Sequence, residues 1–147
     1  MALFSSQCDN PNAAYTYYHE DASAVVGTHQ LGTGLGIQLD SLSVEYVTSA
    51  TVGNRRLSFR VTNLVLGQIF FLVQSPILQP ESVTYNYYFV ANAPNSMTGT
   101  HITIGIPVFK WYEPLYVTII DTNNIATVSD TMKIAYCGKY VENSRRI

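Results

Sequence analysis

The chain has 147 residues with a formal net charge of −2, and 47% of them are apolar, which suits one domain with its own core. Charged residues make up only 12%, about half of the usual ~25%, whereas tyrosine occurs 11 times. This composition excludes a disordered chain. The absence of a basic stripe argues against direct nucleic-acid binding.

Few charges and many tyrosines are typical of a surface that partner proteins cover. A neutral surface of the secreted type would have the same composition, so both interpretations stay open here. No apolar run approaches ~18 residues, and we therefore expect no membrane-spanning helix. The start of the chain, MALFSSQCDN, lacks the basic and apolar regions of a secretory signal. We expect Cys8 and Cys137 to be thiols in a reducing cytoplasm, with one disulfide between them as the alternative.

Residues 1–36 show no clear period, yet they contain apolar anchors such as Tyr15, Tyr17 and Tyr18. The pattern predicts an extended N-terminal arm that lies on a neighbouring subunit, followed by a sandwich domain over residues 37–147. The alternative is that this region supplies one or two further strands of the same sandwich. The glycines of residues 32–36 favour a hinge over a phosphate loop, because a strand follows them and not a helix.

From residue 37 onward, apolar and polar residues alternate with a period of two in segments rich in β-branched and aromatic side chains. Turn residues separate these segments. Seven strands are predicted, over residues 42–47, 57–62, 68–74, 83–90, 101–106, 115–120 and 132–137. Short strands at this spacing predict an all-β fold, a β-sandwich or barrel.

No catalytic constellation stands out in the sequence. The chain has no G-x-S-x-G elbow, and Cys137 has no basic neighbour in sequence nearer than Lys139 to activate it as a nucleophile. His19, Glu20 and Asp21 are adjacent, so on an extended chain their side chains point apart and hold no metal ion. We therefore expect no enzyme activity, no metal and no cofactor.

Trp111 lies in an aromatic stretch, FKWYEPLY. Aromatic side chains on a β-sandwich can form a platform for sugars, which keeps a carbohydrate-binding module as an alternative function. Closure of the core or an anchor at a protein interface are the more common uses of such a cluster. We take Trp111 as an interface candidate.

Two adjacent arginines follow the Gly53-Asn54 turn, at the start of a predicted strand. Arg55 shares the parity of the core-facing residues, so its stem can cover the end of the core while its head reaches water or carbonyls. Arg56 and Arg60 share the outer face, where they could bind carboxylates or carbonyls of a neighbour. All three are interface candidates, and simple solubility of an outer face is the alternative.

The segment from Val47 to Arg56, VTSATVGNRR, followed by an alternating strand, resembles a motif of small structural proteins of tailed bacteriophages. The later order of strands and turns is also similar, and the resemblance covers about residues 42–141. It implies a jelly-roll-like β-sandwich in the virion, with capsid decoration or cementing as the role. The chain departs from the pattern at residues 68–74, which are more apolar, and in its long arm.

The expected function is therefore that of a virion structural protein, made in the host bacterial cytoplasm, that binds and stabilises the capsid. Its expected partners are the major capsid protein and further copies of itself in a closed oligomer, such as a homotrimer, that hides sheet edges. A head–tail connector or a fibre component of the virion is the alternative within the same class.

Overall fold

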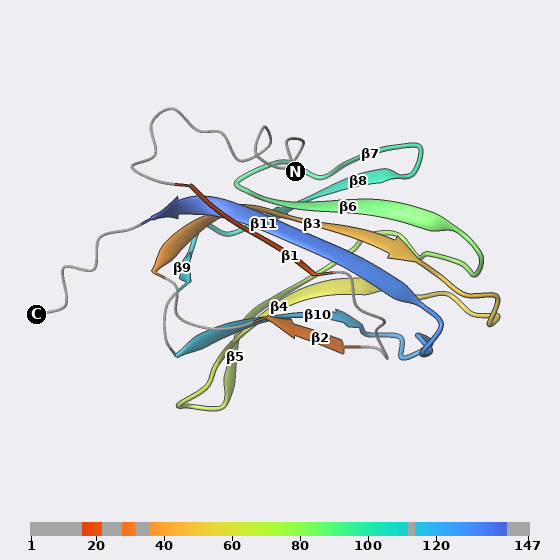
Figure 1. The fold of residues 1–147 in the computed structure, drawn as a ribbon, viewed down its shortest axis with the longest axis horizontal. Coiled ribbons are helices and arrows are strands. Elements are labelled where there is room, and N and C mark those ends of the chain that lie inside the picture. Colours follow the sequence, from red (N-terminus) through yellow and green to blue (C-terminus); the bar gives the residue numbers. More distant parts are fainter. Residues whose placement is uncertain (1–15, 22–27, 32–35, 112–113, 141–147) are drawn as a thin grey trace, which may run out of the picture.

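The computed structural model describes residues 16–21, 28–31, 36–111 and 114–140, which form two β-sheets packed face to face (Figure 1). The larger sheet contains, in spatial order, β1 (Thr16–Asp21), β11 (Thr131–Tyr140), β3 (Ile37–Val47), β6 (Thr84–Ala91), β8 (His101–Ile106) and β7 (Ser96–Thr98), with β9 (Lys110–Trp111) paired to β3. The smaller sheet contains β2 (Thr28–Leu31), β10 (Leu115–Asp121), β4 (Leu57–Asn63) and β5 (Gln68–Gln74). The all-β sandwich predicted from the sequence is confirmed.

The order of the strands is that of a jelly roll. When β1 to β6, β10 and β11 are counted in chain order from one to eight, the two sheets read 1-8-3-6 and 2-7-4-5. Eight antiparallel strands wound in this way form two Greek keys. The strands β7, β8 and β9 are additions between the sixth and seventh strands, and β8 extends the larger sheet by pairing parallel to β6.

The core lies between the sheets because alternate residues of each strand face inward. β3 shows this most clearly, with Leu42, Val44 and Tyr46 buried and the residues between them partly or well exposed. β4 is buried on both parities for most of its length. The aromatic centre of the core is built by Phe59, Phe89, Tyr87 and Trp111.

All seven strands predicted from the sequence are present, with boundaries that shift by a few residues. Two further strands lie in the region predicted as an arm: β1 pairs antiparallel with β11, and β2 pairs antiparallel with β10. This part of the predicted arm is therefore a component of the sandwich, which was the alternative interpretation. Residues 1–15, and residues 32–35 of the hinge predicted over residues 32–36, lie outside the described residues.

The two ends of the sandwich differ in character. The loops β3–β4, β5–β6 and β10–β11 come together at one end, on the right in Figure 1, whereas the β4–β5 turn points toward the other end. No helix in the described part of the chain has the length and apolar character needed to cross a membrane.

A buried arginine network and an exposed apolar hairpin

Arg55 lies in the interior, with none of its side chain exposed to solvent. Its backbone forms an isolated bridge to Gln79, in which each N–H donates to the other's carbonyl at 2.8 Å. Its guanidinium contacts the carboxylate of Asp130 twice, from Nε to Oδ2 at 3.1 Å and from Nη2 to Oδ1 at 3.2 Å. The prediction that Arg55 contacts a partner is therefore wrong, because its own chain surrounds and binds the charged head.

The remaining donors of Arg55 bind the β3–β4 loop. Nη1 donates to the carbonyl oxygens of Thr51 at 2.9 Å and Gly53 at 2.7 Å, and Nη2 donates to Ser49 Oγ at 3.3 Å. A guanidinium has five N–H groups, and all five find an acceptor here. The predicted core parity of Arg55 and the contact of its head with carbonyls are confirmed.

Asp130 is the buried carboxylate that compensates the charge of the buried Arg55 guanidinium. Its carboxylate also accepts hydrogen bonds from Tyr46 Oη at 2.9 Å and from the Ser49 backbone N–H at 2.8 Å. Burial alone would raise the pKa of Asp130, but the bonds from Arg55, Ser49 and Tyr46 outweigh it and lower the pKa below its usual value. Burial and the bond to Asp130 raise the pKa of Tyr46. The network therefore holds one charge state at neutral pH.

Gln79 extends the network to the β5–β6 loop. Its Nε2 donates to the carbonyl of Tyr46 at 2.8 Å, and its Oε1 accepts from Tyr87 Oη at 2.8 Å. Gln79 is fully buried, so each of these bonds also satisfies a group that water cannot reach. The network joins three loops at one end of the sandwich, and its chemistry is structural.

Arg56 and Arg60 are both half-buried. The Arg56 head donates from Nη1 to the carbonyl of Ser75 at 2.5 Å, so it too is engaged within its own chain. Arg60 stands on β4 between Leu72 of β5 and Thr118 of β10, on the outer face of the smaller sheet. Arg60 remains an interface candidate.

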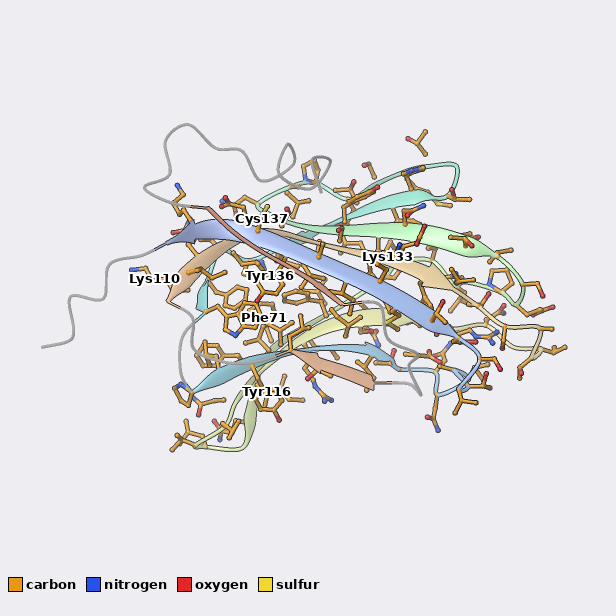
Figure 2. All side chains as sticks on the ribbon, viewed as in Figure 1. Phe71, Lys110, Tyr116, Lys133, Tyr136 and Cys137 are labelled. Atoms are coloured by element: carbon orange, nitrogen blue, oxygen red, sulfur yellow. The ribbon has the colours of Figure 1, made fainter. Side chains whose placement is uncertain are left out.

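Trp111 is fully buried on β9, opposite Ile37 of β3. Its ring packs against Tyr136 of β11, with the ring centroids 4.9 Å apart. Tyr136 lies between the two sheets in Figure 2. Trp111 closes the core, so its prediction as an interface residue is wrong. The sugar platform would require an exposed indole, and Trp111 cannot supply it.

The tyrosines of the predicted arm fall partly outside the described residues. Tyr15 lies outside them. Tyr17 and Tyr18 belong to β1, where they stand opposite Gly138 and Cys137 of β11. Their role at an interface stays a prediction, as does the state of Cys8, which also lies outside the described residues.

Among the described residues, exposed apolar side chains gather on β5 and the turn before it. We call this surface the apolar hairpin, and its exposed side chains are those of Leu64, Val65, Leu66, Ile69, Phe70 and Leu72. Their exposed fractions range from 43% at Leu72 to 76% at Val65. No charged residue occurs from Val61 to Pro80, so no charge interrupts this surface along the chain.

Sequence reasoning noticed that residues 68–74 are unusually apolar but did not identify them as a surface. The inner side of β5 is anchored: Phe71 stacks on Phe59 at a centroid distance of 6.0 Å and meets Phe109 edge-on at 5.4 Å. Figure 2 shows Phe71 reaching into the space between the sheets. The uncharged stretch is therefore two-sided, with one side in the core and the other in solvent.

The chemistry available at the surface is that of apolar contact. The described residues contain no group of three or more histidine, cysteine, aspartate or glutamate side chains placed to hold a metal ion. An exposed apolar patch of this kind marks an interaction site more often than a catalytic one.

Comparison with known proteins finds no matching family model and no matching curated protein. Among solved structures, the chain is similar to that of tomato aspermy virus with a TM-score of 0.36 and 8% identity, over 99% of this chain and 94% of that one. It is similar to infectious bursal disease virus, Gx strain, with a TM-score of 0.38 and 7% identity, over 93% of this chain and 45% of that one.

A third similar structure is an exo-β-agarase, with a TM-score of 0.36 and 10% identity, over 95% of this chain and 25% of that one. The chain thus spans less than half of the bursal disease virus and agarase chains. All three TM-scores are below 0.5, so these similarities do not assign a function to the chain. Its jelly-roll fold is assigned from its own strand order.

Proposed function

We propose that the protein is a structural component of a tailed-bacteriophage virion that binds the capsid lattice and stabilises it, as a decoration or cement protein does. The observation that carries this proposal is the apolar hairpin, which has six exposed apolar side chains on a segment without a charged residue. Its partners would be the major capsid protein and further copies of the chain itself.

The physical support comes from the cost of leaving such a surface in water. Burial of apolar surface stabilises by about 25 cal/mol per Å². Soluble monomers normally protect an edge strand with charges, and β5 has none. An edge strand that partner proteins cover in an assembly does not need protective charges.

Two further observations favour the virion over other assemblies. Viral capsid domains are one of the main uses of the jelly-roll architecture, alongside lectins and cupins. The segment over residues 42–141 also resembles small structural proteins of tailed phages in its motif and strand order. Burial of Trp111 removes the platform on which the carbohydrate-binding alternative depended. We also propose that the chain is not an enzyme.

The test uses shells of the parent phage that lack this protein. Added protein should bind the shells at a copy number proportional to the major capsid protein and raise the temperature at which they break open. Val65→Lys, which places a charge on the tip of the apolar hairpin, should reduce binding at least about tenfold, since a desolvated charge costs more than 1.4 kcal/mol.

The matched control is Val128→Lys, which makes the same change at another exposed valine, in the β10–β11 loop. It should bind shells as the unchanged protein does. A few copies at a single site would indicate the connector or fibre alternative. Absence of binding to shells would contradict the proposal.

A further inference from the structure

The strand β5 forms an open edge of the smaller sheet. The sheet order is β2-β10-β4-β5, so β5 pairs with β4 on one side, and no other described strand pairs with it. It carries no charge and no proline, two of the usual means of blocking an edge. Its one irregularity is a bulge at Phe70, where the register with β4 shifts. The regular part of the open edge is therefore Phe71–Gln74.

The hydrogen bonds to β4 show which backbone groups remain open. The Ser75 N–H donates to the carbonyl of Leu57 at 2.8 Å, so these two residues form a hydrogen-bonded pair. Such pairs alternate along an antiparallel ladder. The groups of Val73 and Phe71 consequently face β4, whereas those of Leu72 and Gln74 face outward from the sheet.

The side chains alternate in the same way, because β5 is pleated. Phe71 and Val73 pack against the core. Leu72 is 43% exposed on the outer face, next to Arg60 of β4. The edge therefore offers open backbone groups and an apolar outer residue at the same position, Leu72.

We infer that β5 pairs antiparallel with β5 of a second copy of this chain, about a twofold axis at Leu72. In this register Leu72 stands opposite Leu72 of the second copy, and their outward N–H and carbonyl groups bond reciprocally. Phe71 stands opposite Val73 of the second copy on the core side. Apolar residues thus meet apolar residues on both faces, and the two smaller sheets become one continuous sheet.

A second copy fits this edge better than an unlike strand. A twofold axis presents the same surface to itself, so one charge-free strand matches the other without a second set of residues. A register centred on Val73 would set Leu72 against Gln74 and Phe71 against Ser75, so that apolar side chains would face polar ones. A charged partner strand would find nothing on β5 to pair with its charges.

This inference concerns the protein alone in solution and needs no capsid, although Leu72 also belongs to the apolar hairpin. It uses the edge of β5, whereas the capsid test uses the tip at Val65. It also replaces the homotrimer expected from the sequence with a dimer at this contact, since two like edges that pair antiparallel form a closed pair.

The first test is the solution mass of the full-length protein by light scattering over a range of concentrations. The expected mass is twice the 16.3 kDa of one chain. Leu72→Glu should weaken the dimer by about 30-fold or more, the effect of losing a central contact, and so give a monomer. The monomer should stay folded by circular dichroism, because Arg60 stands beside the new carboxylate.

Val128→Glu is the matched control, with an exposed valine far from β5 in sequence, and it should remain dimeric. Mixing Leu72→Glu with Leu72→Lys should restore a dimer that neither variant forms alone, because the axis then pairs opposite charges. That rescue depends on residue 72 facing itself, and a general loss of folding would not produce it.

A cysteine pair tests the register. Oxidised Leu72→Cys should form a covalent dimer, since directly opposed Cα atoms lie within disulfide range, whereas Gln74→Cys should not. The unchanged protein measures the background from its own cysteines. A monomer or a trimer at all concentrations, or a dimer that Leu72→Glu leaves intact, would overturn the inference. A cross-link at residue 74 in place of residue 72 would overturn the register.

Discussion

Arg55 and Arg56 are neighbours in sequence, yet they have different environments because successive residues of a strand point to opposite faces. Arg55 enters the core, and its charge is neutralised by Asp130 across 75 residues of sequence. Breaking such a buried pair costs more than the pair contributes, because the remaining charge stays in a medium that solvates it poorly. The free energy of unfolding should therefore be sensitive to Asp130.

We expect Asp130→Asn to lower the free energy of unfolding by about 3 kcal/mol at pH 7. The pKa of Asp130 is lowered in the folded protein, so its contribution is present above the unfolded value of about 3.9 and is lost as the pH falls through the folded value. Urea unfolding at pH 7, 4.5 and 3 should show a smaller acid loss in the variant than in the unchanged protein. Glu45→Gln, on an exposed site of β3, is the control. An equal acid loss in both proteins would contradict this assignment.

Among the strands of the larger sheet, β11 lies next to the edge, with β1 on one side and β3 on the other. Its register with β3 shifts between Cys137 and Gly138. A β-carbon at Gly138 would collide with the backbone carbonyl of Gln38. Backbone cannot move aside as a flexible side chain can, so this glycine is needed for the close approach of the two strands.

Gly138→Ala should lower the free energy of unfolding by about 1–3 kcal/mol, the usual cost of forcing extra atoms into a packed site. Lys133→Ala, at an exposed position of the same strand, should change it by less than about 0.5 kcal/mol. Urea unfolding monitored by circular dichroism measures both. If the two variants have the same free energy of unfolding, the close approach at Gly138 does not contribute to stability.

In the whole sandwich, the two described strands from the first 36 residues, β1 and β2, each form one edge of a sheet. β1 covers the edge of β11, and β2 covers the edge of β10 (Figure 1). A chain that begins at Ile37 should therefore expose two new edges and lose the ladder bonds of ten residue pairs. At about 0.5–1.5 kcal/mol for each hydrogen bond, the free energy of unfolding should fall by at least about 3 kcal/mol.

A chain that begins at Tyr15 is the control, because it keeps β1 and β2. Urea unfolding and light scattering compare the two, and the shorter chain should also aggregate at lower concentration. Equal stability would mean that β1 and β2 add nothing to the sandwich, and that residues 1–36 act as the arm expected from the sequence.

The strands from residue 37 onward, the all-β class and the core parity of Arg55 could be predicted from the sequence, because period-two alternation and turn residues are local signals. The sequence left open whether residues 1–36 form an arm or supply further strands, because β11 and β10, the partners of β1 and β2, lie about a hundred residues away. It also placed Trp111 and Arg55 at an interface, because residue type alone does not say whether a large side chain closes a core or faces a partner.

The positions of the charges and of the apolar surface depend on how the strands pack in three dimensions. The sandwich brings Asp130 to Arg55, which turns an apparent surface charge into a buried pair. It also leaves β5 at the edge of the smaller sheet with its outer side uncovered by any described strand. Burial depends on which strands become neighbours, and that is a property of topology, which no local pattern in the sequence contains.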